Sequence, residues 1–479
     1  MDAYKSQYRI QLYMLLLLLL ATVALGNATT NLSCTSSCSC EYYTGSFVVE
    51  CRENSVADEE ELSEKLNSLL PLYSNLTHGN LTALYITNTP LKHVPRPVCH
   101  VTTLKYLFLD NNQLTRLPDD CFPHLKHLTT LTATGNKIVR LQDGLFDGLQ
   151  ELELLDISSN HISEIGLHVF SNESDMISPR SIILSYNNLT TIEPWPLIRG
   201  LHGRGASEVT IFLNNNRIST STNEIQWEIK CTESYGFPVG LHFYYVYVHL
   251  GHNKIRHMMD IKDGWNFTFF QLNCLWSYNS VKIIFAANPF ACDCIDYPMY
   301  VFLNATESLI YDPLYKCYCS NVDSPFHNTA VKKVPWDQFV CNLTERCPHG
   351  CRCVHRPANS MVDVDCSSAN NTSILPSELP KLPDSHTKYK LDFSNNRYLR
   401  RLDHLPYFIN TSILDVNNCD INELPLSVWK DISAMKKVSM DGNCLTSLPP
   451  AVETVPLTAS LSFGRNPWAC SCENRWMFS

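Results

Sequence analysis

The stretch LFLDNNQL at residues 107–114 recurs, with variations, along most of the 479-residue chain. A second clear copy, LDISSNHI, occupies residues 155–162. The apolar residues three and five places before the asparagine alternate with other residues, which is the period-two pattern of a strand. The asparagine is expected to turn inward, where its amide can satisfy backbone groups freed by the turn. Each copy therefore predicts one short strand followed by a turn with an asparagine beneath it.

The asparagine position, called the ladder position below, recurs twelve times, most often at intervals of 23 or 24 residues. It is occupied by Thr89, Asn112, Asn136, Asn160, Asn187, Asn216, Asn253, Asn288, Asn396, Cys419, Asn443 and Asn466. This interval lies inside the range of leucine-rich repeats, whose units bury their apolar edges only by stacking. The sequence predicts an α/β leucine-rich-repeat solenoid, a curved horseshoe with a parallel sheet on its concave face and disulfide-rich caps. Longer intervals between Asn160 and Asn288 indicate either binding loops on one side or padding.

The first 26 residues have the features of a cleaved signal peptide. Lys5 and Arg9 form a positive start, an apolar run covers 12–25, and small residues at 24 and 26 fit a cleavage site. No second apolar run of spanning length follows. An exported chain is expected to be glycosylated at Asn-x-Ser/Thr sequons. The candidate sites are Asn27, Asn31, Asn75, Asn80, Asn172, Asn188, Asn266, Asn304, Asn342, Asn370, Asn371 and Asn410.

The formal net charge is −10, and no basic stretch stands out. Nucleic acid and anionic membrane surfaces are therefore not expected partners, whereas a basic ligand is weakly favoured. The same acidity also serves solubility. No common catalytic motif occurs, and Asp110 and Asp156 lie two repeats apart, or roughly 10 Å at the usual strand spacing. We expect neither catalysis nor a cofactor.

The outward residues of the predicted strands include more aromatic and isoleucine side chains than solubility requires. Exposed aromatic residues are enriched at binding hot spots. The candidate ligand-binding residues on the concave face are Tyr106, Phe108, Ile183, Phe212, Tyr247 and His249. The alternative is that glycans, an insertion or neighbouring side chains cover them. A pH-sensing role for His249 and His252 is a further alternative.

The 21 cysteines of an exported chain are expected to form disulfides. Clusters at 34–51 and 347–366 each precede a repeat block, where a solenoid needs a cap. Zinc is the competing interpretation of such clusters. Within four cysteines three connectivities are possible. The candidate disulfide cysteines are Cys34, Cys38, Cys40, Cys51, Cys99, Cys121, Cys231, Cys274, Cys292, Cys294, Cys317, Cys319, Cys341, Cys347, Cys351, Cys353 and Cys366.

Several cysteines can be interpreted individually. Cys99 and Cys121 occupy near-equivalent places in adjacent turns, within the Cα separation that a disulfide requires; Cys231 and Cys274 are a weaker pair of the same kind. Either Cys317 or Cys319 is surplus in a cap that needs four cysteines. Cys419 is expected to be a buried thiol at the ladder position, and Cys444 has no evident partner. Cys470 and Cys472 open a second cap whose closing cysteines lie beyond Ser479, which predicts a longer protein.

The predicted organisation alternates caps and repeats. It comprises a signal peptide at 1–26, a cysteine-rich N-terminal cap at 27–80, repeat block 1 at 81–291, a C-terminal cap at 292–346, a second N-terminal cap at 347–385, repeat block 2 at 386–468 and the start of a second C-terminal cap at 469–479.

This order resembles the ectodomain of the Toll and Toll-like receptor family, of the invertebrate type with more than one cysteine cluster. The most specific feature is the junction of two caps, NPFACDC at 288–294 and CPHGCRC at 347–353, followed by NPWACSC at 466–472. The resemblance implies a single-pass receptor with a cytoplasmic TIR domain, placed on the outer face of the plasma membrane. It also implies a cystine-knot cytokine or a microbial product as ligand, and signalling by homodimerisation. No family contact residue is carried over.

Two other functions fit the same sequence features. A secreted matrix, adhesion or guidance protein also strings capped repeat blocks together, and Slit-like proteins are of that kind. A soluble decoy would follow if Ser479 were the natural end. The sequence beyond Ser479 distinguishes these possibilities.

Overall fold

The computed structural model describes residues 38–43, 46–52, 59–74, 80–166, 168–170, 179–191, 208–219, 245–260, 281–305, 316–322, 324–367, 369, 374–382, 387–448 and 460–469. The chain divides into two compact units. Unit 1 comprises Met1–Phe290 with Thr306–Tyr318, and unit 2 comprises Ala291–Ala305 with Cys319–Ser479. Predictions outside the described residues are the signal peptide at 1–26, Cys34, Cys231, Cys274, Cys470, Cys472 and the sequons at Asn27, Asn31, Asn75, Asn172, Asn266, Asn370 and Asn371.

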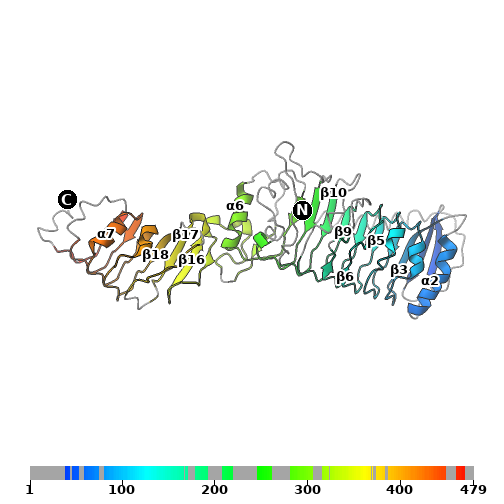
Figure 1. Ribbon diagram of the computed structural model, residues 1–479, viewed down its shortest axis with the longest axis horizontal. Helices are drawn as coiled ribbons and strands as arrows, with labels where there is room; N and C mark the ends of the chain where they lie inside the picture. The colour runs from blue at the N-terminus through cyan, green and yellow to red at the C-terminus, as the bar shows by residue number, and fades with distance from the viewer. Residues whose placement is uncertain are drawn as a thin grey trace. The chain divides into compact units, whose positions relative to one another are not determined.

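Unit 1 contains a ten-stranded sheet whose strands follow one another in chain order (Figure 1). Only its first pair of strands is antiparallel. All later neighbours pair in parallel, mostly one short strand per repeat. The strands are β1 (Cys38–Tyr43), β2 (Ser46–Arg52), β3 (Asn80–Thr87), β4 (Tyr106–Phe108), β5 (Thr130–Thr132), β7 (Leu154–Asp156), β9 (Ser181–Ile183), β10 (Glu208–Phe212), β11 (Tyr245–His249) and β12 (Val281–Ile284). A separate parallel pair, β6 (Arg140–Leu141) and β8 (Glu164–Ile165), lies outside this sheet.

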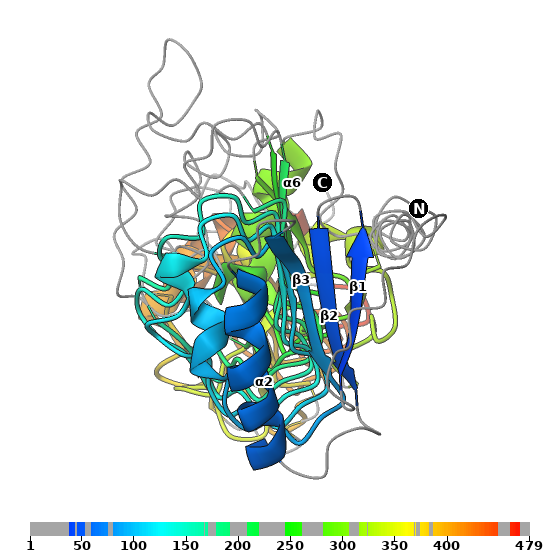
Figure 2. The same ribbon diagram turned by 90° about the vertical axis from the view of Figure 1, so that its right-hand side faces the viewer.

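Helix α2 (Glu59–Ser74) contacts β3 at the amino-terminal end of this sheet (Figure 2). It buries Leu62, Leu66 and Leu70, which are four residues apart and so share one face of the helix. The α2 helix therefore covers apolar surface that the first repeat would otherwise expose. Two short 3-10 helices, η2 (Arg96–His100) and η3 (Phe122–His124), follow in the next two turns.

The core of unit 1 is built by the apolar positions of the repeat. Leu107 and Leu109, five and three places before Asn112, are fully buried. In successive turns, Phe122, Phe146 and Phe170 pack against one another at tilted angles, with ring centroids 5.8 and 5.3 Å apart. The predicted leucine-rich-repeat solenoid is thereby confirmed, with one continuous apolar interior shared between turns.

The ladder asparagines join each turn to the one before it. Asn136 is representative: its Oδ1 accepts from the Leu114 amide at 3.0 Å, and its Nδ2 donates to the Leu109 carbonyl at 2.8 Å. Asn136 is 4% exposed, so both hydrogen bonds are buried. The turn leaves these backbone groups without a backbone partner, and the asparagine side chain pairs with them. The same contacts recur from Asn112 to Asn288. At the first ladder position, where threonine replaces asparagine, the backbone N–H and the hydroxyl of Thr89 both donate to Asn112 Oδ1.

The residue before each ladder position has a positive φ, between 53° and 65°. These residues are Asn88, Asn111, Gly135, Ser159, Tyr186, Asn215, His252 and Ala287 in unit 1, and Asn395, Asn418, Gly442 and Arg465 in unit 2. Asparagine and glycine enter this left-handed region most readily, and they occupy seven of the twelve positions. The turn geometry therefore repeats even where the residue type does not favour it.

Unit 2 has its own seven-stranded sheet, antiparallel among its first three strands and parallel afterwards. The strands are β15 (Cys341–Asn342), β16 (Arg352–Arg356), β17 (Met361–Asp365), β18 (Lys388–Asp392), β19 (Thr411–Asp415), β20 (Lys437–Ser439) and β21 (Ser460–Ser462). Its helices are α6 (Tyr297–Ala305) and α7 (Leu426–Ser433), with 3-10 turns η4 (Cys294–Asp296), η5 (Val331–Lys333), η6 (Trp336–Gln338), η7 (Pro357–Asn359) and η8 (Pro406–Asn410). Two short strands, β13 (Pro289–Phe290) and β14 (Tyr318–Cys319), border the division between the units.

Disulfides hold the caps, and the structure assigns their connectivity. The described pairs are Cys38–Cys51, Cys99–Cys121, Cys292–Cys319, Cys294–Cys341, Cys347–Cys353 and Cys351–Cys366. The Cα atoms of Cys99 and Cys121 are 4.6 Å apart, as neighbouring turns allow. Cys40 is also disulfide-bonded. Cysteines bonded in this way have no thiolate to offer a zinc ion.

Of the described cysteines, Cys317, Cys419 and Cys444 are not part of a disulfide. Cys317 is therefore the surplus cysteine of its cap, and its inclusion among the disulfide candidates was wrong; Cys319 reaches Cys292 instead. Cys419 is buried at the ladder position, and its Sγ lies 3.4 Å from the Phe393 carbonyl. Burial raises the pKa of this thiol to about 11, so it stays protonated and unreactive.

Within the described ranges, no helix is both long enough and apolar enough to cross a membrane. In the same part of the chain, no group of three or more histidine, cysteine or acidic residues is arranged to hold a metal ion.

Candidate functional site

The candidate site is the outer surface of the unit 1 sheet, where strand residues point away from the core. Parallel register aligns one such residue from each strand into a row. The row comprises Glu50, Tyr85, Phe108, Thr132, Asp156, Ile183, Phe212, His249 and Ile284, and is called the aromatic row below. Four of the six candidate residues belong to it, so residues from four different repeats lie along one line of the surface.

The aromatic row begins with a stacked pair of rings. Tyr85 and Phe108 lie 4.4 Å apart between centroids, with an interplanar angle of only 6°. Both side chains are half-buried, which leaves part of each ring open to a partner. Burial, followed by the nearby Glu50 and Tyr106, raises the pKa of the Tyr85 hydroxyl above its usual value. The Tyr85 hydroxyl therefore remains neutral and able to donate at physiological pH.

The middle of the row is polar and acidic. Asp110, one row further along, accepts from the Thr132 hydroxyl at 2.7 Å and from the Thr134 amide at 2.7 Å. Asp156 accepts from the Ser158 amide at 2.9 Å. Burial raises the pKa of the Asp156 carboxyl, against the lowering effect of its hydrogen bonds to Ser158. These carboxylates cap the ends of their strands, a structural role that needs no substrate.

A second ring pair, Phe212 and His249, follows on strands β10 and β11. The centroids are 4.6 Å apart at an angle of 23°. Each residue is only 7% exposed, so the expectation that all six candidates lie open on the surface was wrong for these two. The rings cover one another because the strand register places them side by side. Burial lowers the pKa of His249 to about 4, which keeps it neutral and argues against a pH sensor near neutrality.

The two remaining candidates, Tyr106 and Tyr247, lie on the neighbouring row, which also carries Thr130, Leu154, Ser181 and Thr210. Both tyrosines are half-buried, as is Ile183 on the aromatic row. Tyr85 was outside the six candidates, yet it stacks on Phe108. The register between adjacent repeats was the signal that could have identified it.

The sheet of unit 2 carries charge where unit 1 carries rings. Asp365, Asp392 and Asp415 are register partners on three consecutive strands. The hydrogen bond from Ser367 lowers the pKa of Asp365, whereas burial raises that of Asp415. An adjacent row includes Lys390 and Lys437. The surface is mixed in sign and contains no aromatic pair among its described residues.

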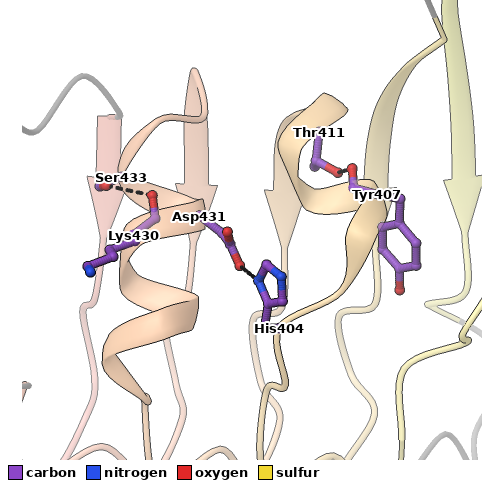
Figure 3. A network of polar contacts seen from close by, with 6 residues as sticks. All are labelled: His404, Tyr407, Thr411, Lys430, Asp431 and Ser433. Atoms are coloured by element: carbon purple, nitrogen blue, oxygen red, sulfur yellow. Dashed lines mark hydrogen bonds and ion pairs between the residues drawn. The ribbon is translucent and has the colours of Figure 1, made fainter. Parts of the chain in front are cut away.

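A polar network on the helical side of unit 2 was not anticipated from sequence (Figure 3). His404 Nδ1 lies 2.7 Å from Asp431 Oδ2, an arrangement that can orient an imidazole. The nearby hydroxyls are occupied: Ser433 donates to the Lys430 carbonyl at 3.0 Å, and Thr411 donates to the Tyr407 carbonyl at 3.0 Å. Among the six residues drawn in Figure 3, no hydroxyl is directed at His404.

The repeated strands, the asparagine ladder and the disulfide caps together define a leucine-rich-repeat solenoid. A leucine-rich-repeat family profile matches residues 79–138. Protein toll of Drosophila melanogaster is 24% identical over 335 residues, which cover 64% of this chain and 29% of Protein toll. Leucine-rich repeat-containing protein 3 of Danio rerio is 28% identical over 131 residues, which cover 26% of this chain and 45% of that protein.

Among solved structures, the Toll–Spatzle complex of Drosophila superposes with a TM-score of 0.58 at 20% identity, over 84% of this chain and 54% of the Toll chain. The resemblance to a Toll-like leucine-rich-repeat ectodomain is confirmed by these comparisons. The multiple-cysteine-cluster type stays a prediction. The matched region spans less than a third of Protein toll.

Proposed function

We propose that this chain is the ligand-binding part of a Toll-type signalling receptor and that it binds a protein cytokine on the aromatic row of unit 1. The observation that carries the proposal is the Tyr85–Phe108 stack, a half-open apolar surface on a rigid sheet. Partly exposed aromatic residues on a fixed scaffold supply binding energy at little entropic cost. The Toll–Spatzle complex supports a protein ligand for a related fold.

The proposed contact residues differ in their expected weight. Tyr106, Phe108, Ile183 and Tyr247 are half-buried and therefore partly available to a ligand. Phe212 and His249 are nearly covered and would contribute mainly by shaping the surface on which the ligand rests. Glu50, Asp110 and Asp156 add negative charge beside the rings, which favours a basic face on the ligand. A cystine-knot cytokine is the proposed class of ligand, with a microbial product as the alternative.

Signalling is proposed to follow the receptor pattern, in which ligand binding brings two copies of the chain together. The full-length protein would then be held at the outer face of the plasma membrane. The part described here would have no enzymatic activity, because the proposed function requires only that it recognise a ligand.

The proposal is tested with the secreted chain and recombinant Spatzle as the probe, by surface plasmon resonance. We expect Phe108→Ala to weaken binding at least tenfold, because truncating a hot-spot ring costs more than about 1.4 kcal/mol. Lys390→Ala is the matched control, since it changes an outward residue of the other sheet, and should leave affinity unchanged. Binding that Phe108→Ala leaves intact would move the site off the aromatic row. Failure of Spatzle and other cystine-knot cytokines to bind would favour a microbial product as the ligand, or a matrix or guidance function.

A further inference from the structure

Tyr186 is a bulky residue in a position that suits small ones. It immediately precedes ladder residue Asn187, its φ is 58°, and its side chain is 61% exposed. The equivalent residue in the turns on either side is Ser159 or Asn215. A left-handed backbone is disfavoured for an aromatic residue, and a ring that is mostly exposed gains little burial in compensation. The ring at Tyr186 therefore calls for a reason that the polypeptide fold does not provide.

The residues after Tyr186 provide one, because 186–190 read YNNLT and place a sequon at Asn188. The two adjacent asparagines do different things. Asn187 is 5% exposed, and its side-chain Oδ1 accepts a hydrogen bond from the Ile162 backbone N–H at 2.9 Å. Asn188 is partly exposed and bonds through its backbone N–H to the Ile162 carbonyl at 2.8 Å. In the described part of the chain, the Asn188 side-chain amide makes no hydrogen bond, so it is free to be modified.

We infer that Asn188 carries an N-linked glycan whose first N-acetylglucosamine stacks on the ring of Tyr186. The modification forms a bond between Asn188 Nδ2 and the anomeric carbon of a lipid-linked oligosaccharide. The lipid pyrophosphate leaves with the bonding electron pair, and the amide nitrogen loses one proton. No redox partner is needed.

The local geometry allows this contact. Asn187 is buried, whereas its neighbours Tyr186 and Asn188 are exposed and partly exposed. Two residues span at most about 7 Å between Cα atoms, which one sugar and one phenol ring can bridge. The face of an aromatic ring carries partial negative charge and attracts the polarised C–H groups of a sugar. The contact would cover the exposed ring and offset its backbone strain.

The sequon at Asn410 shows why the exposure of Tyr186 matters. An aromatic residue, Phe408, also lies two places before Asn410, but it is 1% exposed and belongs to the core. The exposed apolar neighbour there is Ile409, at 86%. A glycan on Asn410 therefore has no available ring two residues away. Asn410 is a matched sequon that lacks the proposed contact.

The inference changes the assignment of the surface around the candidate site. Tyr186 follows Ile183 on the same turn, and its exposed ring could be taken for a ligand contact. A glycan seated on Tyr186 would instead occupy that ring and mark the border of the ligand-binding face. The inference requires passage through the secretory pathway, but not ligand binding.

The test is a double-mutant cycle on the full chain secreted from eukaryotic cells. Tyr186→Asn is made in the native chain and in an Asn188→Gln background, and thermal melting is recorded together with glycan occupancy by mass spectrometry. In the native chain we expect Tyr186→Asn to lower the melting temperature by a few degrees, because the sugar contact is lost. In the Asn188→Gln background it should raise the melting temperature, because asparagine accepts the left-handed backbone.

His252→Asn is the matched control, since His252 is exposed, has a φ of 54° and has no sequon beside it. It should raise the melting temperature equally in both backgrounds. Trimming the glycan to a single N-acetylglucosamine should preserve the Tyr186 effect. An unmodified Asn188, or a Tyr186→Asn effect that is the same in both backgrounds, would overturn the inference. Neither result bears on ligand binding, so failure of this inference is distinguishable from failure of the proposed receptor function.

Discussion

The sheets of unit 1 and unit 2 share the same parallel register but present different side chains. Four residues before the ladder position, unit 1 carries Phe108 and Phe212, whereas unit 2 carries Asp392 and Asp415. The first set stacks into ring pairs, and the second forms a line of carboxylates beside lysines. The repeat fixes where an outward residue stands but not what it is. The two units therefore use one scaffold for surfaces that suit different contacts.

The largest expected effect comes from placing a charge in either core. Leu107→Asp in unit 1 should destabilise the neighbouring turns by more than about 4 kcal/mol, because it buries an unpaired carboxylate. Leu414→Asp is the corresponding change in unit 2, and both leucines are fully buried. Hydrogen exchange will show protection lost around the substituted turn in each case. Normal secretion and unchanged protection would contradict the core assignment.

Acid should affect unit 1 through His249. Its pKa is lowered to about 4 in the folded chain, against an ordinary value of 6.5. Above pH 6.5 the imidazole is neutral in both the folded and unfolded states. Between pH 6.5 and 4 the unfolded chain binds a proton that the folded chain refuses, so stability falls by up to about 3 kcal/mol as the pH drops. Below pH 4 no further loss follows from this residue.

The measurement is urea denaturation of the native chain and of His249→Phe at pH 7 and pH 4.5. The variant keeps an aromatic ring beside Phe212 and should lose less stability on acidification than the native chain. Asp156 in unit 1 and Asp415 in unit 2 have raised pKa values and act in the opposite direction, so the difference between the two chains isolates His249. Equal losses in both chains would show that the burial of His249 does not control its protonation.

Exchanging asparagine and cysteine at the ladder position of the two units should give effects of intermediate size. Asn160→Cys should cost about 2 kcal/mol, because the Ile138 amide and the Ala133 carbonyl lose their buried partner. The reverse change, Cys419→Asn in unit 2, should cost nothing or be stabilising, since an amide can reach the Phe393 carbonyl that the thiol now contacts. Chemical denaturation of the two variants provides the readout. A large loss from Cys419→Asn would mean that its turn has adapted to sulfur.

The smallest expected effects concern ion pairs. Arg356 Nε lies 2.6 Å from Asp363 Oδ2 in unit 2, and the two side chains are 33% and 14% exposed. Arg140 and Glu164 in unit 1 are 3.2 Å apart and more than half exposed. Arg356→Ala should cost about 1 kcal/mol, and Arg140→Ala less than about 0.5 kcal/mol, because solvent screens the exposed pair. Thermal melting in low and high salt will separate them, and a larger effect at Arg140 would reverse the ranking.

The repeat itself was predictable from sequence because the ladder residue performs one task in every turn. A buried amide must pair with the preceding backbone, so its spacing is strict, and Cys419 could be identified as an occupant of the same position. The Cys99–Cys121 pair was accessible for the same reason, since equivalent places in adjacent turns are close together.

Features that depend on contacts between repeats of unequal length were less accessible. The number of cysteines showed that Cys317 or Cys319 was surplus, but only the tertiary approach of Cys292 decides between them. The burial of Phe212 and His249 likewise depends on register across an insertion of irregular length. Periodicity predicts that such residues point outward and cannot predict how far a neighbour covers them.

The register of the aromatic row also fixes the distance between its two ring pairs. Phe108 belongs to the first ring pair and Phe212 to the second, and four strand steps separate these two residues. At about 4.8 Å per step, that distance is roughly 19 Å. An extended peptide needs about six residues to cover it. A molecule the size of a single sugar or nucleotide that rests on the half-open Tyr85–Phe108 pair would not reach the surface above Phe212 and His249, so a ligand that covers both positions must be at least this long.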